Sequence, residues 1–182
     1  PDGKTALMIG TGDIGSHFAR LCKAVGMETI GVRRNPSIEA EGIDHVVGFE
    51  SLDNVLQYAD VIAMSVPSTP ATRHLLNAER IASLKPDAII INAGRGDAIE
   101  SQALADALAE GRIRGAALDV TEPEPLPANS PLWCEPKCLI TPHVAGGNHL
   151  EITERSIISI ALGNVRCYAN GQSLDNRMPL KG

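Results

Sequence analysis

The stretch TALMIGTGDIG, residues 5–15, decides the fold that this sequence predicts. It opens with an apolar run typical of a buried strand, continues into spaced glycines, and leads into an amphipathic segment, Ile14 to Val25, typical of a helix. In such a turn Gly10 permits a tight bend, Gly12 lets another group approach the backbone, and Gly15 lets the helix pack closely on the strand. We therefore expect a strand–turn–helix unit with free N–H groups at the start of its helix.

The glycines have the spacing G-x-G-x-x-G, which between a strand and a helix is typical of a loop that binds the pyrophosphate of a dinucleotide. The partial positive charge at the helix N-terminus would face the phosphates. A glycine-rich turn without a ligand is the alternative, and the flanking strand and helix favour the binding loop. The expected contacts are Gly10, Thr11, Gly12, Asp13, Ile14 and Gly15.

The rest of the chain repeats this alternation of strand and helix. The 182 residues suit one domain, and 43% hydrophobic residues with only 3% aromatic ones indicate a core of small aliphatic side chains. Strands that are apolar throughout and alternate with helices predict class α/β with a doubly wound parallel sheet, the Rossmann fold. We expect strands at residues 5–9, 28–32, 45–48, 59–66, 87–92, 115–120 and 138–141, and helices at residues 14–25, 71–84, 101–110 and 150–169.

The end of the second predicted strand, about 20 residues after the glycines, is where a sequence of this kind selects its dinucleotide. An Asp or Glu there would bind the ribose 2′-hydroxyl of NAD, but this sequence has Arg33 and Arg34. Two guanidiniums suit a 2′-phosphate and leave no carboxylate to repel it. Two solvated surface arginines are the alternative. Because the position is so specific, we expect NADP as the cofactor in preference to NAD.

Charge and composition argue against several other classes of protein. The net charge is −6 and the basic residues form no runs, so we expect no nucleic-acid partner. No apolar run approaches the roughly 18 residues that span a membrane, and no signal peptide is visible, so we expect a cytoplasmic protein. Cys22, Cys134, Cys138 and Cys167 match no zinc signature, although Cys134 and Cys138 could form half of a site. Free thiols and no metal are the favoured interpretation.

Four further segments resemble the motifs of one family. Residues 66–72 read VPSTPAT, residues 92–96 read NAGRG, residues 117–126 begin with ALDV and end with EPL, and residues 141–147 read TPHVAGG. They resemble the VPxTPxT, NxxRG, ALDVxxxEPL and TPHxxG motifs of the D-isomer-specific 2-hydroxyacid dehydrogenases, in particular glyoxylate and hydroxypyruvate reductases. The segments occur in the family's order and at compatible intervals, and the resemblance covers nearly the whole chain.

By this resemblance Arg95, Glu124 and His143 form the catalytic set, and the chemistry of reducing a 2-oxo acid agrees. Arg95 offers a forked pair of donors to the carboxylate and the carbonyl of the substrate. His143 donates a proton to the carbonyl oxygen as hydride reaches C2. Glu124 would hydrogen-bond the other imidazole nitrogen, which favours the imidazolium and fixes the ring. Glu122 is the near competitor for that role, and the family pattern alone favours Glu124.

The resemblance also implies further contacts with the dinucleotide. The sequence departs from the family at Ser65, where His is common, and at Arg33, where Asp is usual. The second departure points away from NAD. The implied contacts are Val66 and Pro67 with the adenosine side, Thr72 with a phosphate, and Ala93 and Asp119 with the nicotinamide amide.

Members of that family carry about one further domain's worth of chain before the dinucleotide domain. Because this sequence opens with Pro1 and has no initiator methionine, we expect a fragment: a single NAD(P)-binding domain, residues 1–182, that lacks the substrate domain. Residues 148–182 would form a helix and a tail that return to the missing domain. Two apolar stripes on this helix, one through Ile157 and one through Ile158, predict cover by that domain or by a partner subunit, most simply in a homodimer.

These observations predict an oxidoreductase that transfers hydride between NADP(H) and a small 2-oxo acid such as glyoxylate or hydroxypyruvate, inactive without the substrate domain. The alternative from another class is a non-catalytic, dinucleotide-sensing scaffold of the corepressor type, known among the relatives. The presence of Arg95, Glu124 and His143 together favours the enzyme. Formate oxidation is disfavoured, because that branch of the family carries an uncharged amide at the position of Glu124.

Overall fold

The structure, a computed structural model, describes residues 2–146 and 150–177. The chain falls into two compact units, which divide between Val144 and Ala145 and are described in turn. The first unit contains every candidate site residue. Of the motif residues quoted above, Gly147 lies outside the described residues.

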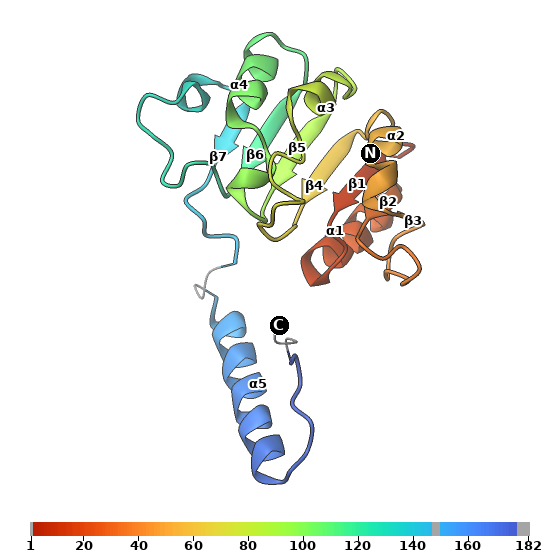
Figure 1. The fold of residues 1–182 in the computed structure, drawn as a ribbon, viewed down its shortest axis with the longest axis vertical. Coiled ribbons are helices and arrows are strands. Elements are labelled where there is room, and N and C mark those ends of the chain that lie inside the picture. Colours follow the sequence, from red (N-terminus) through yellow and green to blue (C-terminus); the bar gives the residue numbers. More distant parts are fainter. Residues whose placement is uncertain (1, 147–149, 178–182) are drawn as a thin grey trace. The chain divides into compact units, whose positions relative to one another are not determined.

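Seven strands of the first unit form one parallel sheet (Figure 1). They are β1 (Thr5–Ile9), β2 (Glu28–Val32), β3 (His45–Val47), β4 (Val61–Met64), β5 (Ile89–Asn92), β6 (Gly115–Leu118) and β7 (Cys138–Ile140). Their order in the sheet is β3-β2-β1-β4-β5-β6-β7, so the direction of winding reverses between β1 and β4. All carboxyl ends lie at one edge, and the reversal point at that edge is where open α/β sheets bind ligands.

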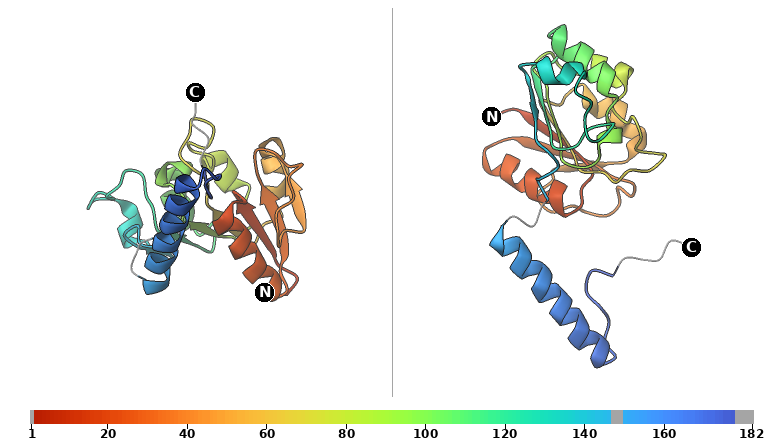
Figure 2. Two further views of the ribbon diagram at one scale, coloured as in Figure 1. Left: turned by 90° about the horizontal axis from the view of Figure 1, so that it is seen from below. Right: turned by 90° about the vertical axis from the view of Figure 1, so that its left-hand side faces the viewer.

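Helices cover both faces of this sheet (Figure 2). They are α1 (Asp13–Ala24), α2 (Leu52–Leu56), α3 (Ala78–Ala82) and α4 (Ser101–Ala109), with short 3-10 helices η1 (Phe49–Ser51), η2 (Gly96–Ala98) and η3 (Pro131–Cys134). Successive side chains of a strand point to opposite faces. On β1, Leu7 and Ile9 therefore enter the core beneath α2, α3 and α4, while Ala6 and Met8 pack against α1. The doubly wound α/β sheet is thus confirmed.

The expected helix at residues 71–84 is wrong over most of its length, because α3 covers only Ala78–Ala82. Upstream of α3 the backbone bonds to the loop after β5 instead. The N–H of His74 donates to a carbonyl of that loop at 2.7 Å, and the N–H of Leu76 donates to another at 3.0 Å. These partners are distant in sequence, so local periodicity carries no sign of them. The other expected elements are present, with ends that differ by up to two residues, while α2 has no counterpart among the expected helices.

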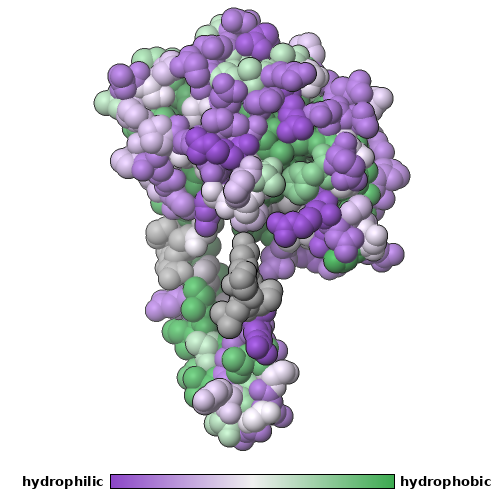
Figure 3. Space-filling model, viewed as in Figure 1, coloured by the Kyte–Doolittle hydropathy of each residue, from purple (hydrophilic) through white to green (hydrophobic). Residues whose placement is uncertain are grey.

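The second unit contains helix α5 (Glu151–Ala169) and the tail after it. Asn164 of the helix exchanges two hydrogen bonds, of 2.8 and 3.1 Å, with the backbone of Asp175, which holds the tail beside the helix. No residue of α5 is buried. Figure 3 shows apolar residues, in green, along the visible side of this helix. The exposed large hydrophobic residues of α5 are Ile152, Ile157, Ile158, Ile160, Leu162, Val165 and Tyr168. Their cover by a partner or a further domain stays a prediction.

Within the described part of the chain, no helix combines the length and the apolarity of a membrane span.

Asp44, in the turn before β3, links α1 to β2 through its carboxylate. It accepts hydrogen bonds from the ammonium of Lys23 in α1 and from the hydroxyl and the N–H of Thr29 in β2, the latter two at 2.8 and 3.1 Å. The hydrogen bond from Lys23, followed by that from the Thr29 hydroxyl, lowers the pKa of Asp44 to about 2. The charged form of this carboxyl therefore stabilises the fold.

Replacing Asp44 with asparagine should lower the free energy of unfolding by about 1–2 kcal/mol at neutral pH, allowing for screening by water around Lys23. The pKa is lower in the folded than in the unfolded protein, so the contribution is present above the unfolded value of about 3.9. It is lost as the pH falls through the folded value of about 2. Urea unfolding at neutral and at low pH measures this, with the exposed Asp87→Asn as the control. A difference that persists undiminished at low pH would contradict the assignment.

Candidate functional site

The glycine loop between β1 and α1 has the shape of an anion-binding turn. Gly10 has a φ of +98°, and a Cβ on it would lie 2.9 Å from the carbonyl oxygen of Ser65. A Cβ on Gly15 would lie 2.0 Å from the carbonyl oxygen of Gly10, so the helix packs on the loop backbone to backbone. A Cβ on Gly12 would meet nothing within 4 Å, and no side chain caps the start of α1. The first N–H groups of α1 are therefore placed to bind an anion.

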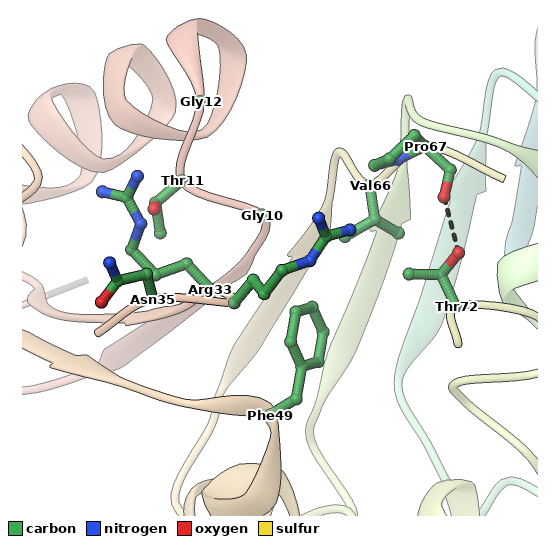
Figure 4. A pocket seen from close by; sticks show the side chains of 10 residues that line it. Gly10, Thr11, Gly12, Arg33, Asn35, Phe49, Val66, Pro67 and Thr72 are labelled. Atoms are coloured by element: carbon green, nitrogen blue, oxygen red, sulfur yellow. Dashed lines mark hydrogen bonds between the residues drawn. The ribbon is translucent and has the colours of Figure 1, made fainter. Parts of the chain in front are cut away.

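A cavity of about 260 Å³ lies beside this loop, at the point where the strand order reverses (Figure 4). Its walls come from the glycine loop, the end of β2, the start of η1 and the loop after β4. In that last loop the hydroxyl of Thr72 donates to the carbonyl of Pro67 at 2.6 Å and accepts from the N–H of Thr69 at 2.9 Å. The lining residues are Gly10, Thr11, Gly12, Arg33, Arg34, Asn35, Phe49, Val66, Pro67 and Thr72.

The polar groups around this cavity fit the phosphates of a dinucleotide. Thr11 is 7% exposed, and its hydroxyl oxygen is buried without a hydrogen-bond partner among the described residues. Its methyl group rests on Gly31, where a Cβ would lie 2.6 Å away, so the direction of the hydroxyl is fixed. Arg33 donates to the carbonyls of residues 38–39 at 3.1 and 3.4 Å, and Arg34 is exposed. None of the described lining residues is acidic, so a phosphate here would meet cations without a competing carboxylate.

Arg95 lies on the loop after β5, which Asn92 holds in shape. The side-chain amide of Asn92 donates to the carbonyl of Arg95 at 2.9 Å and accepts from the N–H of Gly94 at 3.0 Å. A Cβ on Gly94 would lie 2.9 Å from backbone atoms of Val66, so this loop touches the loop after β4. The Arg95 side chain is exposed, with Nη1 donating to the carbonyl of Gly94 at 2.7 Å. Arg95 thus presents a guanidinium at the carboxyl edge of the sheet, where it could bind a carboxylate.

His143, on the turn after β7, binds the carboxylate of Glu124. The distance between His143 Nδ1 and Glu124 Oε1 is 2.7 Å, and the two side chains are 47% and 43% exposed. His143 has a φ of +55°, a left-handed conformation uncommon outside glycine, and its N–H donates to the carbonyls of Asp119 and Thr141 at 2.9 and 3.0 Å. With Nδ1 bonded to a carboxylate, Nε2 is the ring nitrogen that could exchange a proton with a substrate.

Asp119 anchors the same turn from the end of β6. Its Oδ1 accepts from the hydroxyl of Thr141 at 2.6 Å and from the N–H of Val144 at 2.9 Å. A second cavity, of about 200 Å³, opens beside the His143–Glu124 pair. Sequence reasoning missed Trp133 in its wall, although the only tryptophan of the chain was an available signal. The lining residues are Asp119, Thr121, Glu124, Pro125, Leu126, Trp133, Ile140, Thr141, Pro142 and His143.

The structure separates the two glutamates that the sequence leaves as competitors. Glu124 binds His143, whereas the carboxylate of Glu122 binds Arg73 Nη2 at 2.9 Å and His74 Nε2 at 2.8 Å. Sequence reasoning missed Arg73 and His74, because it placed them on a helix that does not form. The basic pair directly after the VPSTPAT motif was the available signal.

The candidate residues fall into two groups along the carboxyl edge of the sheet. The glycine loop, the arginines after β2 and the loop after β4 line the first cavity, and the candidates after β6 and β7 line the second. Ala93 and Arg95 follow β5, which lies between β4 and β6, and line neither cavity. Asp13 and Ile14 are exposed at the start of α1, Gly15 is buried there, and these three residues also line neither cavity. Contacts of this segment with a pyrophosphate would come from the backbone N–H groups at the start of the helix.

The cysteines are free thiols in this structure. Burial raises the pKa of the Cys138 thiol to about 11, which makes it a poor nucleophile and metal ligand. Among residues 2–146 and 150–177, no three His, Cys, Asp or Glu side chains gather as metal ligands would.

Comparisons with known proteins agree with this geometry. The family model described as "D-isomer specific 2-hydroxyacid dehydrogenase, NAD binding domain" matches residues 1–145. A hydroxypyruvate reductase of Blautia hydrogenotrophica is 34% identical over 176 residues, which cover 96% of this chain and 53% of that protein. The chain spans about half the length of the curated relatives it matches.

Two solved structures of relatives contain nicotinamide dinucleotides. The D-isomer specific 2-hydroxyacid dehydrogenase from Xanthobacter autotrophicus Py2, in complex with NADPH and MES, has a TM-score of 0.85 at 35% identity and covers 97% of this chain and 71% of that chain. The D-lactate dehydrogenase with NAD+ from Lactobacillus jensenii has a TM-score of 0.81 at 29% identity and covers 97% of this chain and 55% of that chain. Relatives of this fold therefore include structures with either dinucleotide.

Proposed function

This chain belongs to the D-isomer specific 2-hydroxyacid dehydrogenases, as an NAD-binding domain, and on that premise we propose that it serves an NADP(H)-dependent reductase of small 2-oxo acids. One observation carries the proposal most directly: the 2.7 Å bond between His143 Nδ1 and Glu124 Oε1. It supports the role of His143 as an oriented proton donor, at the same edge of the sheet as the glycine loop and Arg95. An acid, a cation and a dinucleotide loop are the parts that reduction of a 2-oxo acid needs.

In this proposal each catalytic residue acts at a stated atom. A bound nicotinamide supplies the hydride that reaches C2 of the substrate. Arg95 binds the substrate carboxylate and polarises the carbonyl oxygen. His143 gives its Nε2 proton to that oxygen, so the C=O group becomes CH–OH with one hydride and one proton added. Glu124 accepts from Nδ1–H, which holds the ring and stabilises its positive charge before the proton leaves.

The dinucleotide contacts are assigned in the same way. The loop from Gly10 to Gly15 would bind the pyrophosphate, with Thr11 buried beside it. Arg33 and Arg34 would bind a ribose 2′-phosphate, which distinguishes NADP from NAD. The remaining assigned contacts are Val66 and Pro67 with the adenosine side, Thr72 with a phosphate, and Ala93 and Asp119 with the nicotinamide amide.

Arg34→Asp should reduce the affinity for NADPH by roughly 1.5–3 kcal/mol, or about 10- to 150-fold, and leave the affinity for NADH unchanged or higher. Arg33→Asp should do the same, although Arg33 also bonds to the loop of residues 38–39, so Arg34 gives the cleaner result. Titration calorimetry with both dinucleotides measures the effect. Arg114→Asp, an equal charge change at an exposed position, is the control. Equal affinity of the unmodified protein for NADPH and NADH would contradict the proposal.

We further propose that turnover needs a second protein surface opposite this domain. Arg95 is exposed, and His143 and Glu124 are each nearly half exposed, at 47% and 43%. A substrate on such an open surface would be held in many poses and in contact with water. The part of the relatives' chains that this chain does not match is a candidate for that second surface. Consumption of NADPH in the presence of glyoxylate or hydroxypyruvate, by this chain and by the full-length protein, tests the reaction itself.

The second unit and the cysteines support two smaller proposals. The exposed apolar side chains of α5 support a homodimer, or packing of residues 148–182 on a substrate domain. The free thiols support a reducing, cytoplasmic location. The three catalytic candidates give the alternative of a non-catalytic scaffold no support.

A further inference from the structure

The side chain of Glu122 makes contacts that the proposed reaction does not explain. Its carboxylate binds two basic side chains of the loop after β4: Arg73 Nη2 lies 2.9 Å from Oε1, and His74 Nε2 lies 2.8 Å from Oε2. The Glu122 side chain is 26% exposed, so both bonds are partly shielded from water. Each oxygen of the Glu122 carboxylate therefore has its own partner, which restricts the side chain more than a single contact would.

The backbone around Glu122 is fixed as firmly as its side chain. The hydroxyl of Ser101, at the start of α4, donates to the carbonyl of Glu122 at 2.9 Å. The preceding residue, Thr121, lies directly on Gly96, where a Cβ would stand 1.9 Å from the carbonyl oxygen of Thr121. Gly96 is the neighbour of Arg95. The segment that leads to Glu124 is therefore packed against the segment that carries Arg95.

The loop that supplies Arg73 and His74 is itself tied to the Arg95 loop. His74 has a φ of +46°, and its N–H donates to the carbonyl of Asp97 at 2.7 Å. The hydroxyl of Ser68 donates to the carboxylate of Asp97 at 2.5 Å. The loops after β4, β5 and β6 are thus joined by hydrogen bonds and ion pairs at the carboxyl edge of the sheet. The side chain of Glu122 connects the loop after β6 to the loop after β4.

We propose that Glu122 is a positioning residue: through Arg73 and His74 it holds residues 121–124 so that Glu124 meets His143 Nδ1. One residue separates the two glutamates, so a shift of Glu122 moves Glu124 with it. Glu124 is 43% exposed, which leaves the backbone rather than surrounding side chains to fix its place. The expected effect of Glu122 on turnover rests on the proposed function, whereas its expected effect on the position of the His143 ring does not.

The first test uses this chain alone and needs no substrate. The ring resonances of His143 are identified by NMR from the spectrum of His143→Gln. In Glu124→Gln these resonances should shift, and in Glu122→Ala they should move part of the way in the same direction or broaden. Glu122→Gln should restore them, because the amide still accepts a bond from Arg73. Arg73→Gln removes one contact of Glu122 at a side chain that is 58% exposed, so it leaves no buried cavity. It serves as the second variant if Glu122→Ala does not fold.

The second test measures turnover in the full-length protein. Glu122→Ala should lower kcat about tenfold without changing the Kd for NADPH, the scale of a misplaced catalytic group. In the Glu124→Gln background the same substitution should cost little more, since the residue that Glu122 positions no longer holds a charge. Glu135→Ala, at a half-buried glutamate that accepts a hydrogen bond from the N–H of Lys137, is the control on the neighbouring loop.

Different results would contradict the positioning role of Glu122 and the proposed function. His143 resonances that stay unchanged in both Glu122→Ala and Arg73→Gln would overturn the positioning role. An equal loss of kcat in both Glu124 backgrounds would do so as well, because a general structural defect acts regardless of Glu124. A full-length protein without turnover would count against the proposed function, while the NMR result would still decide the role of Glu122.

Discussion

Replacing Gly12 with aspartate is expected to abolish NADPH binding while the fold stays as stable as before. A Cβ on Gly12 meets nothing within 4 Å, and the residue has a φ of −78° at the N-cap of α1. Aspartate is a favourable N-cap and its charge suits the positive end of a helix, so stability should hold or rise by up to about 1 kcal/mol. A bound pyrophosphate, in contrast, would meet both a new side chain and a like charge. We expect a loss of at least about 100-fold in affinity, or about 2.7 kcal/mol.

Gly15 provides the contrast that makes this result specific. A Cβ there would lie 2.0 Å from the carbonyl oxygen of Gly10, so Gly15→Ala must push the helix off the loop. It should lower the free energy of unfolding by about 1–3 kcal/mol or more, the typical cost of overpacking. Thermal unfolding and calorimetry with NADPH, run on both variants, separate the two effects. Undiminished NADPH binding by Gly12→Asp would mean that the pyrophosphate does not lie on this loop.

Replacing His143 with glutamine in the full-length protein is expected to lower kcat for reduction by about 100- to 10,000-fold and to leave NADPH binding intact. Glutamine keeps a hydrogen-bonding group near Glu124, but its amide is not acidic enough to give a proton to the substrate. Glu124→Gln should cost less, because the amide still accepts a bond from Nδ1–H but no longer stabilises the charge on the ring.

Steady-state rates of reduction by both variants, with the Kd for NADPH measured alongside, test these expectations. A kcat that Glu124→Gln leaves unchanged would mean that the 2.7 Å bond between His143 and Glu124 does not serve the proton donor.

Much of the geometry around the first cavity could be predicted because its determinants are local. The apolar run and the glycines at residues 5–15 give β1 and the start of α1, and the ends of β1 and β2 agree with expectation. Gly10 and Gly15 have the close contacts that the spacing implies. Arg33 and Arg34 line the same cavity as the glycines because the carboxyl ends of parallel strands share one edge.

The features that could not be predicted depend on contacts distant in sequence. Residues 71–77 lack a helix because His74 and Leu76 bond to the loop after β5, which no local pattern records. Glu122 and Glu124 are the same residue type two positions apart. Their different contacts follow from the side chains opposite them, which are Arg73 and His74 for Glu122 and His143 for Glu124. The buried hydroxyl of Thr11 likewise depends on Gly31 in the neighbouring strand.

The most direct test of the central claim is consumption of NADPH by the full-length protein in the presence of glyoxylate or hydroxypyruvate. We predict turnover that requires the 2-oxo acid, forms one 2-hydroxy acid per NADPH consumed, and falls by about 100-fold or more in His143→Gln. With hydroxypyruvate the product should have the D configuration. A full-length protein that binds NADPH but consumes none with any 2-oxo acid, or that turns over equally well without His143, would contradict the account.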